Sequence, residues 1–185
     1  MPAKPTKPTK PAKPAKIAKA AAAAPSSCLE LVLGFLQTDD WPHETAEDGS
    51  AVMTGYEGDN GQFEVTIEVN DEAALVVVHV ALPVVYKAGQ DEEPMDDAAF
   101  GNTFALAMRL NGGLALGNFD LDMDDGSLRF RLGLLLAECP LAPEIVRNHL
   151  YAAVEAADRF MPLFVGTASG ELDCDSALEK LNEAD

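Results

Sequence analysis

The sequence predicts an α+β domain with a five-stranded antiparallel sheet, in the element order α-β-β-β-α-β-β-α. Apolar and polar residues alternate over 61–69, which places Phe63, Val65 and Ile67 on one face of a strand. The turn residues Asp59-Asn60-Gly61 precede this strand and are typical of a tight hairpin. Three longer segments instead repeat apolar residues at helical spacing, so strands and helices are both required.

Each element follows from a local pattern. Ser26 or Ser27 is expected to cap the first helix, which ends before Pro42. The second helix is stopped by Gly112-Gly113, and Pro162 is expected to kink or end the longest helix. The expected helices are 28–36, 96–113, 142–164 and a short one after Asp175, and the first three strands are 51–58, 61–69 and 74–86. Five residues of the second helix are expected to share a face: Phe100, Phe104, Ala107, Met108 and Asn111.

Charge divides the chain into a basic tail and an acidic body. The 185 residues include 13 basic and 31 acidic ones, for a net charge of −18. Six lysines and no acid lie in the tail, so the tail carries +6 and the body carries −24. Such a body repels phosphate backbones and anionic membranes, so nucleic acid could be bound only through the tail. The predicted units are a disordered tail (1–25), one α+β domain (26–170) and a short C-terminal helix or tail (171–185).

The tail places a lysine at every third residue from Lys4 to Lys19, and a proline follows each of the first four lysines. Polyproline II has three residues per turn, so these lysines would lie on one side of an extended rod. Two interpretations remain open. The tail is either a solubilising leader, or a tether to an anionic partner such as nucleic acid or to the protein's own acidic face.

The cysteines indicate a reducing compartment, and the hydropathy indicates no membrane-spanning segment. Cys28, Cys139 and Cys174 are widely spaced and form no CxxC pair, which argues against structural zinc. No apolar run approaches the roughly 20 residues of a membrane span. No leucine-rich stretch precedes the alanines of the tail, so an export signal is not expected and the predicted location is the cytoplasm.

The stretch DLDMDDGSLRFR, residues 120–131, has the acidic composition of a calcium loop. An EF-hand loop that began at Asp120 would need glycine at position 125 and glutamate at position 131, where the chain has aspartate and arginine. A hairpin with Asp125-Gly126 at its centre fits instead. In that register Asp122 faces Arg129, Leu121 faces Phe130 and Asp120 faces Arg131. The aspartates are therefore predicted to be structural.

No motif in the sequence indicates catalysis. His43, His79 and His149 lie in unrelated segments, and no nucleophile, zinc or phosphate-loop signature occurs. The acidic pairs Glu92-Glu93 and Asp96-Asp97 are interpreted as a solvated run that favours the start of the second helix. The prediction is a non-enzyme without catalytic, cofactor-binding or metal-binding residues.

Several short sequence motifs occur in an order that resembles a known family: DDWP, TGYEGDNGQF, LPVVY, LNGGLALGNFDLDMDDGSLRFR and ADRFMP. Over residues 28 to 180 the chain resembles the YbjN-like family, described as bacterial sensory transduction regulators, whose fold is similar to that of type III secretion chaperones. The matching positions Trp41, Gly55, Asn111, Gly117, Asn118 and Phe119 are interpreted as turn and packing residues.

The resemblance implies a regulatory or chaperone-like module that binds another protein and forms a homodimer through the second helix or its neighbouring strand. It supplies no catalytic residue and no cofactor. Two alternatives are a secretion-type chaperone for a protein client and a polyanion or nucleic-acid tether that acts through the tail.

Overall fold

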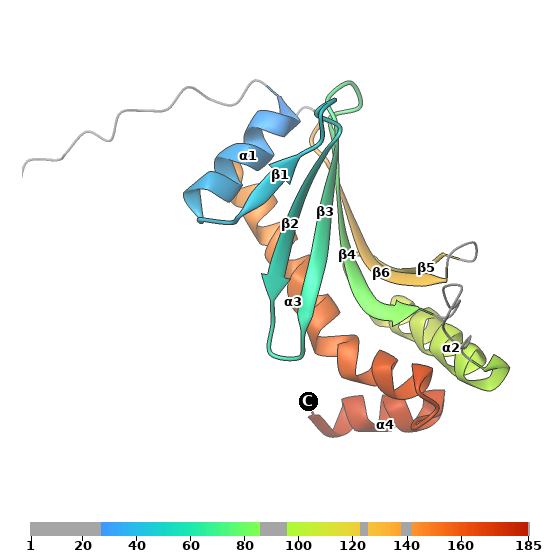
Figure 1. Cartoon of the computed structure of the whole chain (residues 1–185). Coiled ribbons are helices and arrows are strands. Elements are labelled where there is room, and N and C mark those ends of the chain that lie inside the picture. Colours follow the sequence, from blue (N-terminus) through green and yellow to red (C-terminus); the bar gives the residue numbers. More distant parts are fainter. Residues whose placement is uncertain (1–26, 86–95, 123–125, 138–141, 185) are drawn as a thin grey trace, which may run out of the picture.

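A computed structural model describes residues 27–85, 96–122, 126–137 and 142–184 as one layer of strands with helices packed on it (Figure 1). The helices are α1 (Cys28–Thr38), α2 (Asp97–Gly113), α3 (Pro143–Ala168) and α4 (Cys174–Ala184). The strands are β1 (His43–Thr45), β2 (Ala51–Glu57), β3 (Gln62–Asn70), β4 (Leu75–Val85), β5 (Asn118–Leu121) and β6 (Ser127–Leu135). They form a single antiparallel sheet in the order β1-β2-β3-β4-β6-β5.

One face of the sheet carries the core. Helix α1 packs on β3, and α3 packs on β4 and β6, behind the strands in Figure 1. Val65, Ile67 and Val80 lie on this face and are buried, as the alternation predicted. At the β5 end, the ring of Phe119 packs against those of Phe130 and Phe164, with centroids 5.0 and 4.6 Å apart. The α+β class and the antiparallel sheet are therefore confirmed.

The sheet has a sixth strand, β1, that the sequence pattern does not predict. The sequence predicts no strand between Pro42 and residue 51, but His43 and Glu44 pair with Thr54 and Met53 of β2. A strand of three residues at the edge of a sheet contains too few positions to show alternation, and both Glu44 and Thr45 are exposed.

The β5–β6 hairpin forms, but its predicted register is wrong by two residues. Leu121 pairs with Leu128, and Asp120 with Arg129. The pairing ends in a bond from the Asp122 N–H to the Ser127 carbonyl at 2.9 Å. Four residues, 123–126, therefore lie between the paired strands instead of the expected two, and Gly126 takes the positive φ of +76° that such a loop requires. A shift of two residues leaves every side chain on its predicted face.

Helix α3 does not end at Pro162 but continues to Ala168. Proline has no N–H, so the carbonyl of Asp158, four residues earlier, loses its bond within the helix. The side-chain amide of Asn60 donates to that carbonyl at 3.1 Å. The proline is tolerated because the β2–β3 turn supplies the missing donor.

The same aspartate holds the β2–β3 turn on α3. Its carboxylate accepts hydrogen bonds from the backbone N–H groups of Asp59 at 3.1 Å and Asn60 at 2.8 Å. A side chain on Gly58 would overlap this carboxylate, since an added Cβ would lie 2.3 Å from Oδ1. The turn residues read from the sequence therefore form both a hairpin and a contact with a helix 98 residues away.

Candidate functional site

The face of the sheet opposite α1 and α3 is polar and divided by charge; we call it the open face. On β1, β2 and β3 it carries four exposed glutamates and no basic residue, and this region is named the acidic half: Glu44, Glu57, Glu64 and Glu68. On β6 it carries Arg129 and Arg131. The two regions are separated by His79 of β4, whose Nε2 lies 3.4 Å from a carboxylate oxygen of Glu68.

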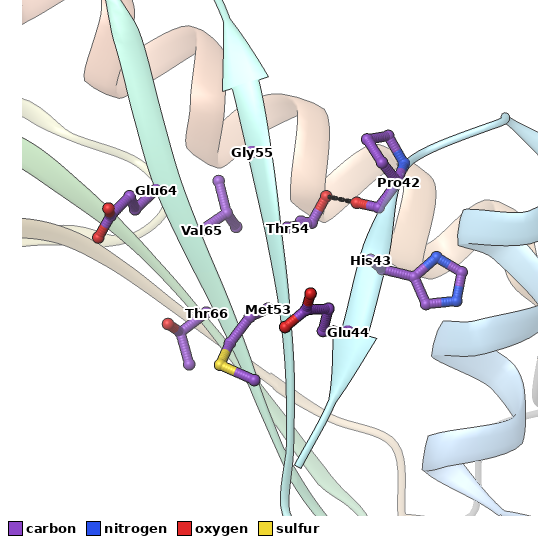
Figure 2. A pocket seen from close by; sticks show the side chains of 9 residues that line it. All are labelled: Pro42, His43, Glu44, Met53, Thr54, Gly55, Glu64, Val65 and Thr66. Carbon is purple, nitrogen blue, oxygen red and sulfur yellow. Dashed lines mark hydrogen bonds between the residues drawn. The ribbon is translucent and has the colours of Figure 1, made fainter.

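The acidic half contains a shallow hollow of about 620 Å³ around Gly55 (Figure 2). Glu44, Met53 and Thr66 occupy neighbouring strands at one level, as the strand register requires. Met53 is 43% exposed, so the hollow presents an apolar side chain beside the glutamates. Pro42 borders it, and its carbonyl accepts a hydrogen bond from the Thr54 hydroxyl at 2.6 Å.

The hollow exists because Gly55 has no side chain, not because the backbone requires glycine there. A Cβ at this position would meet nothing closer than the Phe63 carbonyl, at 3.7 Å. The interpretation of Gly55 as a turn or packing residue therefore finds no support in the structure. A larger residue could be accommodated and would fill the hollow.

The two edges of the sheet differ. At β5, Asn111 of α2 accepts a hydrogen bond from the Phe119 N–H at 2.7 Å and donates to the Phe119 carbonyl at 2.9 Å. These are the groups that an added strand would use. At the other end, no strand of the described ranges pairs with the outer side of β1. Ala46 donates to the Ala51 carbonyl, so by alternation the backbone groups of His43 and Thr45 face away from β2.

An aromatic cluster on the helix side supports the β1 edge. The ring of Trp41 stacks on Tyr56 at 5.9 Å and meets Tyr151 of α3 edge-on at 5.7 Å. Burial, together with the nearby carboxylates of Asp158 and Glu155, raises the pKa of the Tyr56 hydroxyl. Trp41 thus fixes the start of β1, as its interpretation as a packing residue required.

A second exposed apolar surface runs along α2. The predicted shared face divides, because Ala107 is buried while Phe104 and Met108 are 46% and 57% exposed. The partly exposed ring of Phe100 packs 6.3 Å from Phe104 and extends the stripe. The helix is turned so that smaller residues face the core, and we call Phe100, Phe104 and Met108 the α2 stripe.

The structure does not bring the three histidines together. His43 Nδ1 lies 2.8 Å from the carbonyl of Trp41, and in Figure 2 the ring points away from the hollow toward α1. His79 lies on the open face of β4, and two strands, β2 and β3, separate it from His43. His149 Nδ1 lies 2.7 Å from the carbonyl of Ile145 within α3.

Asp96 and the two described cysteines have contacts that are explained by helix capping and burial. Asp96 is the N-cap of α2 and accepts from the N–H groups of Ala98 and Ala99. Glu92 and Glu93 lie outside the described residues, as does Cys139. Cys28 and Cys174 are buried free thiols, and burial raises the pKa of both. In the described part of the chain, no three histidine, cysteine or acidic side chains are grouped to hold a metal ion.

Comparisons with known proteins agree with this geometry. The family profile of YbjN, described as "Putative bacterial sensory transduction regulator", matches residues 29–165. No curated protein matches the chain significantly. Over the four described ranges, none of the helices has the length and apolar character needed to cross a membrane.

Two solved structures are similar in fold. A chain of the ExsC–ExsE complex matches with a TM-score of 0.51 and 16% identity, covering 74% of this chain and 92% of that one. A chain of the HopA1–SchA chaperone–effector complex matches with a TM-score of 0.44 and 15% identity, covering 69% and 87%. The predicted fold, similar to that of type III secretion chaperones, is confirmed by the first of these.

Proposed function

The chain belongs to the YbjN family, and on that premise we propose that it is a non-enzymatic regulatory module that binds an extended segment of a protein partner. The binding surface is the β1 edge together with the hollow of the acidic half. The observation that carries the proposal is the contrast between the two edge strands of the sheet. At β5 the side chain of Asn111 binds the outward backbone N–H and carbonyl of Phe119, whereas at β1 the backbone groups of His43 and Thr45 face outward. An extended peptide can add to such an edge through its backbone and place side chains in adjacent hollows.

The fold comparison supports this proposal by analogy. The similar chain comes from a complex of two proteins, ExsC and ExsE. A narrower version makes this chain a secretion-type chaperone, whose client stays largely unfolded when bound. Backbone amides of the bound partner would then exchange hydrogen rapidly outside the segment on β1.

Two glycines on the open face provide a matched test. Gly55 lies in the hollow, whereas Gly133 lies on β6, where an added Cβ would meet nothing within 4 Å. Neither position has a positive φ, so phenylalanine should be tolerated at both. In affinity capture from the native host, we expect wild type and Gly133→Phe to retain the same protein and Gly55→Phe to lose it. Equal capture by Gly55→Phe, or turnover of a substrate by the purified chain, would contradict the proposal.

We further propose that a second copy of the chain covers the α2 stripe. Apolar side chains on one face of a helix favour pairing with another apolar face, and Phe104 and Met108 are the most exposed of the three. Light scattering should show a dimer for wild type and a monomer for Met108→Glu, because a charge in such a contact would be buried unpaired. Val165→Glu, at an exposed apolar position on α3, should leave the dimer intact. A monomeric wild type would refute this assignment.

A further inference from the structure

We propose that the lysine-proline segment of this chain, residues 4–19, docks on the acidic half of the open face. The segment carries six positive charges and no negative one. This assignment gives the same hollow a second occupant, which would compete with the protein partner proposed above, and it does not depend on that partner.

The charges of the open face favour this half. Glu44, Glu64 and Glu68 are exposed on β1 and β3, and the open side of these strands presents no basic residue. Across β4, the open side of β6 carries Arg129 and Arg131, and Arg129 pairs with Asp120 of β5 at 3.5 Å, so the charges of this half largely offset one another and attract lysines less. A basic segment on this face is therefore directed toward β1–β3, and its long lysine side chains can reach the carboxylates from several positions.

The segment reaches this face from a favourable starting point. The backbone N–H of Cys28, at the start of α1, donates to the carboxylate of Asp71, directly after β3. Cys28, one residue after the first described residue, therefore lies beside the β3–β4 end of the sheet. A second hollow of about 370 Å³ lies at this end of the open face, lined by residues that include Ser50, Glu68 and Asn70. It lies between the chain's entry point and the hollow around Gly55.

The segment is also long enough to cross the open face. In polyproline II geometry, Lys4 to Lys19 would span about 47 Å, with successive lysines about 9 Å apart. A strand of the length of β3 extends over about 30 Å. The seven residues between Lys19 and Ser27 are enough to turn over the end of the sheet, since they span up to about 25 Å.

The hollow offers a surface for the prolines as well as for the lysines. Pro42 and Met53 provide apolar contacts, and the absence of a side chain at Gly55 leaves space for a pyrrolidine ring. Polyproline II segments bind shallow apolar grooves at small cost in conformational entropy, because they are already extended.

The test is carbodiimide cross-linking of the purified full chain, which joins a lysine to a glutamate only where the two are in contact. Peptide mapping by mass spectrometry then locates the links. We expect them to join the tail lysines to Glu44, Glu64 and Glu68, and to disappear at about 1 M salt, where screening is nearly complete. The triple variant E44Q/E64Q/E68Q should lose them.

A matched variant, E171Q/E179Q/E183Q, removes the same charge from exposed positions after α3 and on α4 and should keep the links. Denaturation curves would confirm that both triple variants fold. Gly55→Phe leaves the charge unchanged and should weaken the links by blocking the hollow.

Three outcomes would overturn the proposal. Links spread equally over Glu171, Glu179 and Glu183 would show that the tail has no preferred site. In a mixture of ¹⁵N-labelled and unlabelled chains, links between unlike chains would assign the occupant to a second copy. Absence of links to the body, combined with salt-sensitive binding of a DNA oligonucleotide that requires residues 1–25, would make the tail a polyanion tether instead.

Discussion

The β5 and β1 edges of the sheet show two solutions to the same problem. An edge strand exposes backbone donors and acceptors that can pair with another chain. At β5 the amide of Asn111 satisfies both groups of Phe119, at 2.7 and 2.9 Å, as a neighbouring strand would. The strand β1 is only three residues long, and among the described residues no strand pairs with its outward backbone groups.

The two edges of the sheet are therefore not equivalent for pairing with another chain. The outward backbone groups of β1 face away from β2, whereas those of Phe119 in β5 are occupied by Asn111, and β1 borders the hollow at Gly55 and the glutamates of the acidic half. The backbone pairing surface, the hollow and the negative charge therefore lie together. A module that binds an extended segment would need this combination on one side of its sheet and a closed edge on the other.

Breaking the closed edge should have the largest effect. Asn111→Leu preserves the volume of the side chain but removes both hydrogen bonds to the partly buried edge backbone of Phe119. We expect the free energy of unfolding to fall by about 2–3 kcal/mol, because two partly buried polar groups lose their partners. Urea denaturation measures the loss, and light scattering should detect association through the opened edge.

Asn102→Leu, on the same helix, is the control. Asn102 accepts a single bond from the Cys174 N–H at 3.2 Å, so its loss should cost about 1 kcal/mol and cause no association. Equal losses for the two variants would mean that Asn111 has no special role at the edge.

The two hairpins show how much of a turn and its strand register can be predicted from the sequence. In β2–β3 the turn residues and the alternating strand agree, and Tyr56 pairs with Phe63 across a turn at the predicted place. In β5–β6 the aspartates predicted the hairpin but not its loop length. A register two residues away matches Asp120 with Arg129 as well as the predicted one matched it with Arg131, so pattern alone cannot distinguish them.

The candidate binding surface was less predictable. Gly55 was recognised as a notable position, but a hollow depends on side chains of three strands that only the register brings together. The hydrogen bonds between Asn111 and Phe119 join residues only eight positions apart. Even so, nothing in the sequence distinguishes an asparagine that covers a strand edge from one that merely lies near the C-terminus of a helix. The face of α2 was misjudged because the core uses Leu106 and Ala107, while Phe104 and Met108, which are equally apolar, remain exposed. Apolar character alone therefore does not decide which side of a helix is buried.

At the open edge, two neighbouring prolines should separate strand addition from strand stability. The N–H of Thr45 faces outward, so Thr45→Pro removes a group that only an added strand would use, and edge strands tolerate such a proline. We expect a stability loss below about 1 kcal/mol together with loss of the captured partner. Glu44→Pro removes an N–H directed at Met53 and should cost about 1–3 kcal/mol. A partner that still binds Thr45→Pro would be held by the open face alone.

The smallest expected effect is a pH dependence at the residue that supports β1. Burial and the carboxylates of Asp158 and Glu155 raise the pKa of Tyr56 above the ordinary value of 10.0, because both disfavour the phenolate. The folded state therefore holds this proton more tightly than the unfolded chain does. The resulting stability is fully present below pH 10.0 and is lost as the pH rises through the folded pKa. Chemical denaturation between roughly pH 8 and 11 should show a steeper decline for wild type than for Tyr56→Phe, with Tyr151→Phe as the control for losing a phenol in the same cluster. Parallel curves for wild type and Tyr56→Phe would mean that the phenol is equally free to ionise in both states, and that the Trp41–Tyr56 stack leaves this side of β1 open to water.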